Sequence, residues 1–314
     1  MTDLTLPMGR VWSGFALFGL LSFILLGLIP LIDLAAGGGL MDFAAQAGRA
    51  SEATGIAWTS SLLDIARLAL AEPGLWLLVF GSAVPMLAAL IVIMRQPGWI
   101  AGVLMRLRPF GPETRHPLRA YAFVIAASLL ALLATGVIRS VLYDLPPGAL
   151  LTHFTVALLP AALLAGLLDQ GALLEEGGWR GFANPLLEQV MSPLAASLLV
   201  GLLWALWHLP RDITGGVLAD MGGAAYALAY FPSFLLGALA VSVIAVWGMQ
   251  NSGGSIWPAV LVHGLANDAT GLAGTASMDV ALTAGYQLTK ALPFAAIAMA
   301  LVVIYGRNLR PSGV

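Results

Sequence analysis

Residues 11–34 read VWSGFALFGLLSFILLGLIPLIDL, and only one of these side chains, that of Asp33, is charged. A helix needs roughly 20 apolar residues to cross the ~30 Å hydrocarbon core of a bilayer, and this run is longer. It also exceeds the 7–15 apolar residues of a secretory signal, which predicts a retained span. Of the 314 residues, 60% are hydrophobic and 10% are charged, whereas soluble domains carry about 25% charged residues. The composition therefore predicts an integral membrane protein.

Similar apolar runs follow along the chain and predict an all-α polytopic membrane protein with about eight transmembrane helices. After Val11–Leu34, the expected spans are Leu75–Met94, Ala120–Ile138, Leu150–Leu174, Leu194–Leu209, Ala224–Trp247, Ile256–Leu272 and Leu292–Tyr305, the last of which could begin nearer Ala281. We expect one membrane domain over residues 1–314, with a three-span N-terminal region at 1–149 and a motif-bearing core at 150–270. Residues 35–74 predict either a short amphipathic helix at the membrane surface or a plain surface loop.

Arginine is unevenly distributed between the loops, and this asymmetry predicts the orientation of the helices. With eight spans, the arginines that fall on one side are Arg10, Arg95, Arg106, Arg108, Arg115, Arg119, Arg307 and Arg310. We assign this side and both termini to the cytoplasm. The single lysine, Lys290, among the 14 basic residues hints at a bacterial origin. The expected location is therefore the bacterial inner (plasma) membrane.

The composition also excludes several kinds of chemistry. There is no cysteine, so disulfides, thiolate zinc sites, iron–sulfur clusters and cysteine nucleophiles are ruled out. The formal net charge is −2 and the basic residues form no patch with interleaved aromatics, which disfavours a nucleic-acid partner. Catalysis or metal binding therefore falls to the four histidines, the 16 carboxylates and neutral polar groups. Two of the histidines, His116 and His153, have no polar motif around them and are interpreted as bystanders.

Polar residues concentrate in three of the expected spans, where each ionisable side chain costs about 2.5–3.5 kcal/mol to insert. The three stretches are Leu173-Leu174-Glu175-Glu176-Gly177-Gly178-Trp179-Arg180-Gly181, Trp204-Ala205-Leu206-Trp207-His208 and His263-Gly264-Leu265-Ala266-Asn267-Asp268. Because of this cost, ionisable residues inside a membrane mark functional sites by default. A helix–helix hydrogen bond or a buried structural ion pair is the alternative explanation for each stretch taken alone.

Helical spacing indicates how the polar side chains would act together. Glu176 and Arg180 are four residues apart in the favoured carboxylate-first order, so they can neutralise each other on one helix face. Glu175, rotated by about 100° from its neighbour, would remain free. His263 and Asn267 are also four residues apart, which directs an imidazole and a carboxamide the same way.

The depth of the polar groups predicts that they can meet. With a turn near Ser192, Glu175 lies 17 residues before it and His208 lies 16 residues after it. At ~1.5 Å per residue, both would lie roughly 25 Å from the tip of this hairpin. His263 would lie roughly 14 Å inside its own helix, so the three levels coincide if the tip projects about 11 Å into the cytoplasm. This requires the fourth helix to continue to about Gln189.

A carboxylate, two imidazoles and a carboxamide that converge inside a membrane are suited to amide hydrolysis. Glu175 can deprotonate a water molecule as a general base. His208 can orient that water or bind a metal ion that acidifies it. His263 and Asn267 can donate hydrogen bonds to the oxyanion that forms when a carbonyl group is attacked.

The same residues resemble the CPBP family of intramembrane proteases, the CAAX-protease and bacteriocin-processing group, also called the Abi family. Its three signatures are Glu-Glu-x-x-x-Arg, aromatic-x-x-x-His and His-x-x-x-Asn, which stand here at Glu175 to Arg180, Trp204 to His208 and His263 to Asn267. The resemblance covers roughly residues 150–270. One departure is Trp204, where the family more often has phenylalanine.

The resemblance implies an intramembrane endopeptidase, a hydrolase that cuts membrane-associated peptides or membrane proteins and works in contact with lipid. The catalytic residues it implies are Glu175, Glu176, Arg180, His208, His263 and Asn267, with the site opening from the cytoplasmic leaflet. Zinc or another divalent metal would be bound by Glu175, His208 and His263, and a metal-free glutamate mechanism is an equal alternative. The alternative function is a non-catalytic protein of the same fold that acts in bacteriocin immunity or regulates a partner.

Overall fold

A computed structural model describes residues 6–95, 99–111, 117–144, 159–214, 217–267, 273 and 285–311. His116, His153 and Asp268 lie outside the described residues. The described chain forms α1 (Met8–Ala35), α2 (Phe43–Thr54), α3 (Leu62–Ala71), α4 (Leu75–Met94), α5 (Trp99–Arg106), α6 (Pro117–Tyr143), α8 (Leu159–Leu168), α9 (Gln170–Gly178), the π-helix η2 (Trp179–Ala183), α10 (Asn184–Leu187), α11 (Pro193–Trp207), α12 (Leu209–Thr214), α13 (Val217–Met221), α14 (Gly223–Ala225), the π-helix η3 (Tyr226–Tyr230), α15 (Phe231–Asn251), α16 (Trp257–Ala266), α18 (Tyr286–Tyr305) and the 3₁₀-helix η4 (Gly306–Asn308).

Six helices in the described part of the chain are long and apolar enough to cross a membrane. They are Met8–Ala35, Leu75–Met94, Pro117–Tyr143, Pro193–Thr214, Gly223–Asn251 and Tyr286–Asn308. Each of them corresponds to an expected span, and α4 has the expected bounds. The prediction of an all-α polytopic membrane protein is thereby confirmed, because only helices or closed barrels satisfy their backbone groups in lipid. Of the other two expected spans, the seventh is the shorter apolar helix α16.

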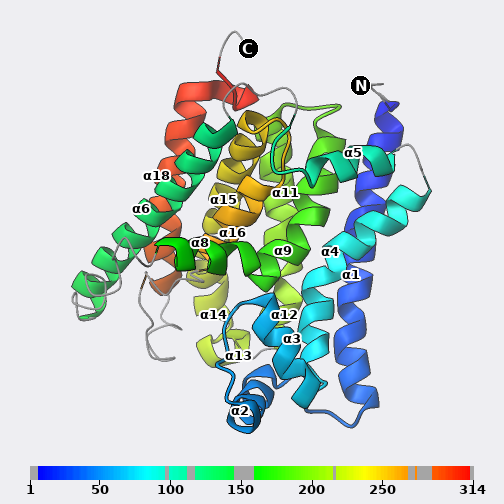
Figure 1. The fold of residues 1–314 in the computed structure, drawn as a ribbon, viewed down its shortest axis with the longest axis vertical. Helices are drawn as coiled ribbons and strands as arrows, with labels where there is room; N and C mark the ends of the chain where they lie inside the picture. Colours follow the sequence, from blue (N-terminus) through cyan, green and yellow to red (C-terminus); the bar gives the residue numbers. More distant parts are fainter. Residues whose placement is uncertain are drawn as a thin grey trace.

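The fourth expected span is not one continuous helix, which corrects the expectation of a single crossing at Leu150–Leu174. Its described part is divided between α8 and α9 at Asp169, whose backbone is extended and whose carboxylate accepts a hydrogen bond from the backbone N–H of Ala172 at 2.9 Å. Figure 1 shows α8 lying across the bundle, whereas α9 runs along it. The physical reason is that Asp169 caps the N-terminus of α9, a position that aspartate favours over the middle of a helix.

Beyond Glu175 the chain runs almost to the expected end of the fourth helix. α9 leads directly into η2 and α10, which ends at Leu187. Ser192 then caps α11 by accepting a hydrogen bond from the N–H of Ala195 at 3.3 Å, and Pro193 occupies the first turn. The hairpin turn is therefore close to the predicted position, and this is what brings the residues of α9 level with those of α11.

The segment between the first two spans contains the helices α2 and α3 and is not a plain loop. The position of these helices at the membrane surface stays a prediction. α3 buries Ile65, Leu68 and Ala69 and leaves Leu63 and Leu70 exposed. In Figure 1, α2 and α3 lie at one end of the bundle, whereas α5 lies at the opposite end with the first turn of α1. The arginine-rich loops are thus on the side where α1 starts, and the assignment of that side to the cytoplasm stays a prediction.

The site is held against α4 by a close approach of two backbones. A Cβ added at Gly178 would lie 2.3 Å from the carbonyl carbon of Pro85 and 2.4 Å from its oxygen. Such distances leave no room for any side chain, so glycine is required at this contact between α9 and α4. This explains why a residue of poor helix propensity stands at position 178, two residues after Glu176.

We expect Gly178→Ala to lower the melting temperature of the purified protein strongly, because the added methyl group overpacks a backbone contact at a cost of about 1–3 kcal/mol. Gly102→Ala in α5 is the matched control, since nothing lies within 4 Å of its added Cβ. Alanine favours the helix at both positions, so only packing separates the two variants. Thermal unfolding of both proteins in the same detergent measures the difference, and equal melting temperatures would contradict the packing argument.

Candidate active site

The side chains expected to form the site come from α9, η2, α11 and α16 and the residues that follow α11 and α16. Five of them are buried, with exposed fractions of 5% for Glu175, 0% for Glu176 and Arg180, 8% for His208 and 2% for His263. The sixth, Asn267, is exposed at the end of α16. The structure therefore gathers these side chains into one polar cluster with a single exposed side.

The indole of Trp204 lies at the centre of this cluster. Its Nε1 donates a hydrogen bond to Oε2 of Glu175 at 2.8 Å. Its ring centroid lies 4.8 Å from that of His263 and 5.5 Å from that of His208, both edge to face. The guanidinium carbon of Arg180 lies 4.9 Å above the same ring, in cation–π range. One tryptophan therefore fixes the relative positions of an acid, two imidazoles and a cation.

Glu176 and not Glu175 is the carboxylate that binds an imidazole directly. Oε1 of Glu176 accepts hydrogen bonds from Nη1 of Arg180 and from Nδ1 of His263, each at 2.8 Å. The expected ion pair with Arg180 is present. Since an ionised carboxylate can only accept, Nδ1 of His263 carries a proton and its Nε2 is directed elsewhere. Glu176 thus sets the tautomer and the orientation of His263.

His208 is oriented in the same way by the main chain. Its Nδ1 lies 2.8 Å from the carbonyl oxygen of Trp204. A carbonyl oxygen cannot donate, so Nδ1 is the protonated nitrogen and Nε2 of a neutral ring keeps a lone pair. The ring is also enclosed by the aromatic rings of Trp207 and Phe234, each with its centroid 5.1 Å away. The ring of His208 is therefore held in one orientation among aromatic neighbours, with Nε2 as its hydrogen-bond acceptor.

The exposed side of the cluster is built around Gly171. A Cβ added there would lie 3.3 Å from Oε1 of Glu175, 3.4 Å from Nδ2 of Asn267 and 3.4 Å from Oδ1 of Asp169. Nδ2 of Asn267 also donates a hydrogen bond to Oδ1 of Asp169 at 3.0 Å. Oε1 of Glu175 and the carboxamide of Asn267 thus face the same small space, which a side chain at position 171 would fill.

Asp169 is a polar residue of the site that is absent from the three sequence motifs. This buried carboxylate caps α9, bonds to Asn267 and has an exposed fraction of 1%. Gln170, the next residue, donates from Nε2 to the carbonyl oxygen of Leu78 at 2.9 Å and to the hydroxyl of Ser82. The available signal was a polar Asp-Gln-Gly sequence inside an apolar run, which is costly in lipid unless it is paired or functional.

The arrangement does not fit the proposed three-ligand metal site. In the part of the chain that the structure describes, no three histidine, aspartate or glutamate side chains are grouped closely enough to bind one ion. Nδ1 of His208 and Nδ1 of His263 already hold other partners, although each ring keeps its Nε2. We therefore derive no catalytic step through a metal held by Glu175, His208 and His263.

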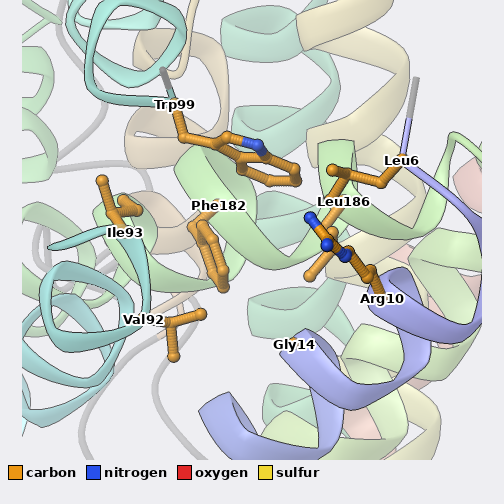
Figure 2. A pocket seen from close by; sticks show the side chains of 8 residues that line it. All are labelled: Leu6, Arg10, Gly14, Val92, Ile93, Trp99, Phe182 and Leu186. Atoms are coloured by element: carbon orange, nitrogen blue, oxygen red, sulfur yellow. The ribbon is translucent and has the colours of Figure 1, made fainter. Parts of the chain in front are cut away.

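A separate, mostly apolar pocket lies between α1, α4, α5 and the η2–α10 segment. Figure 2 shows the rings of Trp99 and Phe182 facing it, with Arg10 opposite Val92. The residues that line it are Leu6, Arg10, Gly14, Val92, Ile93, Trp99, Phe182 and Leu186. None of them belongs to the polar cluster, so this pocket is distinct from the candidate site.

We expect Trp204→Phe to lower the rate of any reaction that depends on Glu175 by roughly 10- to 100-fold. The substitution keeps an aromatic ring but removes Nε1, and hydrogen bonds to charged groups contribute about 1.5–3 kcal/mol. Trp207→Phe is the matched control, because its Nε1 binds only the backbone oxygen of Ser22 at 3.3 Å. Equal turnover numbers (kcat) of the two variants under saturating substrate would show that the indole–carboxylate contact is unimportant.

Comparisons with known proteins match the part of the chain that carries this cluster. Residues 151–269 match the family model described as Type II CAAX prenyl endopeptidase Rce1-like. The chain is also 32% identical over 102 residues to a curated protein of Methanococcus maripaludis named CAAX prenyl protease 2. This similarity covers 32% of the chain and 37% of that relative, so the chain spans little more than a third of the relative's length. The six site residues all lie inside the range matched by the family model.

Proposed function

We propose that this chain, whose motifs resemble those of the CPBP family and whose residues 151–269 match the Rce1-like family model, hydrolyses peptide bonds of membrane-associated peptides or proteins. The observation that carries the proposal is the convergence of Glu175, His208 and His263 on the indole of Trp204 from three separate helices. A lone glutamate or histidine in a membrane has structural explanations. A carboxylate whose second oxygen has no partner among the described residues, beside two oriented imidazoles, matches the needs of a hydrolase.

In this proposal Glu175 activates the attacking water. Its Oε2 is held by Trp204, so Oε1 is the oxygen that takes the proton as the water attacks the substrate carbonyl. His208 presents the lone pair of Nε2 and helps to orient the same water. Once the tetrahedral intermediate collapses, the proton held by Glu175 passes to the leaving amine, which completes the hydrolysis.

Stabilisation of the oxyanion falls to the opposite side of the cluster. Asn267 uses one N–H of its Nδ2 to bind Asp169 and keeps the second N–H for the substrate oxygen. His263 can donate from Nε2 only as an imidazolium, for which the Glu176 carboxylate is the counter-ion. Glu176, together with Arg180, is therefore a positioning residue that acts through His263, whereas Glu175, His208, His263 and Asn267 face the reacting atoms.

The substrate class follows from where the cluster lies. Because the helices that surround it are long and apolar, a substrate must reach the site from the membrane or its surface, which favours lipid-anchored or membrane-inserted peptides. The relative's name refers to prenylated CAAX tails, so a farnesylated CAAX-type peptide is the first probe. The same peptide with a palmitoyl anchor in place of the prenyl group is the second.

The test is cleavage of both peptides by the purified full chain in lipid nanodiscs, in water enriched in ¹⁸O. We expect one scissile bond and incorporation of ¹⁸O into the new carboxylate, as hydrolysis requires. His263→Ala should abolish cleavage, since it removes an oxyanion donor and the partner of Glu176. Unimpaired cleavage by His263→Ala, or intact peptides with the parent protein, would contradict the proposal and favour a non-catalytic protein.

A further inference from the structure

The segment between α2 and α3 is not helical and ends beside the candidate site. α2 ends at Thr54, and Gly55 after it has a left-handed backbone (φ 70°) that turns the chain out of the helix. The next residues reach Ser61, which forms an antiparallel bridge with Asp169. The N–H of Gln170 donates to the carbonyl oxygen of Ser60 at 2.8 Å. The end of this segment is therefore fixed to the start of α9, next to the residues that surround Gly171.

The middle of the segment has an unpaired main chain. In the part of the chain that the structure describes, the N–H and C=O groups of Ala57 and Trp58 have no hydrogen-bond partner, and both residues are exposed. Exposed main-chain donors and acceptors without a partner can bond to a strand that joins them, as at the edge of a sheet. Since Asp169 contacts both Gly171 and Asn267, this edge leads directly to the exposed side of the polar cluster.

We propose that residues 56–60 form the edge to which an extended peptide substrate adds as a β-strand, with its scissile bond delivered to Glu175; this inference rests on the proposed function. A peptide bond within a helix is shielded, so the substrate must be extended before its carbonyl carbon can be attacked. An extended chain near lipid leaves backbone groups unsatisfied at a cost of several kcal/mol each. In paired strands the N–H and C=O groups of one residue face one edge, and those of the next residue face the other. Ala57 therefore supplies the missing partners, and the Trp58 indole, 42% exposed, offers an apolar contact to a substrate side chain.

A kinetic test compares two substitutions at one position. Ala57→Pro removes the backbone N–H and suits an extended chain, whereas Ala57→Ser keeps the N–H. Because this N–H has no partner within the described fold, neither change removes an internal hydrogen bond. We expect Ala57→Pro to raise KM for the tethered peptides about tenfold relative to Ala57→Ser, the effect of losing one main-chain hydrogen bond. The kcat should stay within about twofold, since Ala57 does not contact the reacting atoms. If both variants keep the KM of the parent protein, the substrate does not pair with the main chain at Ala57.

A second test measures binding without cleavage. Because the chain has no cysteine, Trp58→Cys in a Glu175→Gln background introduces a unique thiol into a protein designed to bind without cutting. The probes are the palmitoylated peptides with one cysteine at successive positions, cross-linked by mild oxidation. We expect cross-links at alternate positions, because successive strand residues point to opposite faces. The control is Ala53→Cys on the exposed face of α2, which should give few cross-links and no alternation.

The two tests separate failure of this inference from failure of the proposed function. Alternating cross-links with no cleavage by the parent protein would support strand addition at residues 56–60 and contradict the proposed hydrolase activity. Normal cleavage by the parent, with uniform or absent cross-links at Trp58→Cys, would leave the hydrolase standing and overturn the edge.

Discussion

Glu175→Gln is expected to fold like the parent protein and to lose cleavage of the tethered peptides by roughly 10³-fold, within the 10²–10⁴-fold range of general-base catalysis. Glutamine has nearly the same shape, and its amide oxygen can still accept the hydrogen bond from Nε1 of Trp204. What it cannot do is take a proton from water. The measurement is kcat with saturating substrate, and the melting temperature checks that the fold is intact.

The matched control for this prediction is Glu52→Gln, the same chemical change at an exposed carboxylate on α2. It should leave both kcat and the melting temperature unchanged. A Glu175→Gln protein that cuts as fast as Glu52→Gln would show that another group activates the water. In that case the carboxylate of Glu175 would only hold Trp204 in place.

Much of the fold follows from hydrophobicity along the chain, because a long apolar helix in lipid is specified by its own residues. α4 begins and ends as expected, and α1 and α6 extend the expected spans by a few residues. The interruption at Asp169 was not expected, because one capping carboxylate has little effect on the mean hydropathy of residues 150–174. Breaks of this kind depend on where the capped helix finds tertiary partners, here the chain around Ser60 and Ser61.

The candidate site was predictable as a set of residues but not as a set of contacts. Residue counts from the turn at Ser192 predict Glu175 and His208 at one level, and in the structure both contact Trp204. Helical spacing gave the Glu176–Arg180 pair, but it assigned no partner to His263 beyond its own helix. Which of two adjacent glutamates reaches an imidazole on another helix depends on the rotation of α9. That rotation is set by packing contacts such as the one between Gly178 and Pro85.

Removing Glu176 is expected to have the largest effect on stability. Glu176 and Arg180 are both fully buried, and Nε and Nη2 of Arg180 have no other hydrogen-bond partner among the described residues. Glu176→Ala therefore leaves a buried, uncompensated cation, which costs about 3–5 kcal/mol. We expect a large fall in melting temperature and no cleavage, measured on protein purified in the same detergent as the parent.

Loss of activity in this single variant does not separate a role in folding from a role in positioning His263, but a double variant does. Glu176→Met with Arg180→Met removes both charges, and replacing a buried ion pair by apolar residues of similar size is often neutral or stabilising. The melting temperature should therefore return close to that of the parent. Activity should not return, because Nδ1 of His263 has lost the oxygen that fixes its tautomer and orientation. Recovery of both stability and cleavage would mean that Glu176 and Arg180 serve the fold alone and that His263 is held by Trp204 and its other neighbours.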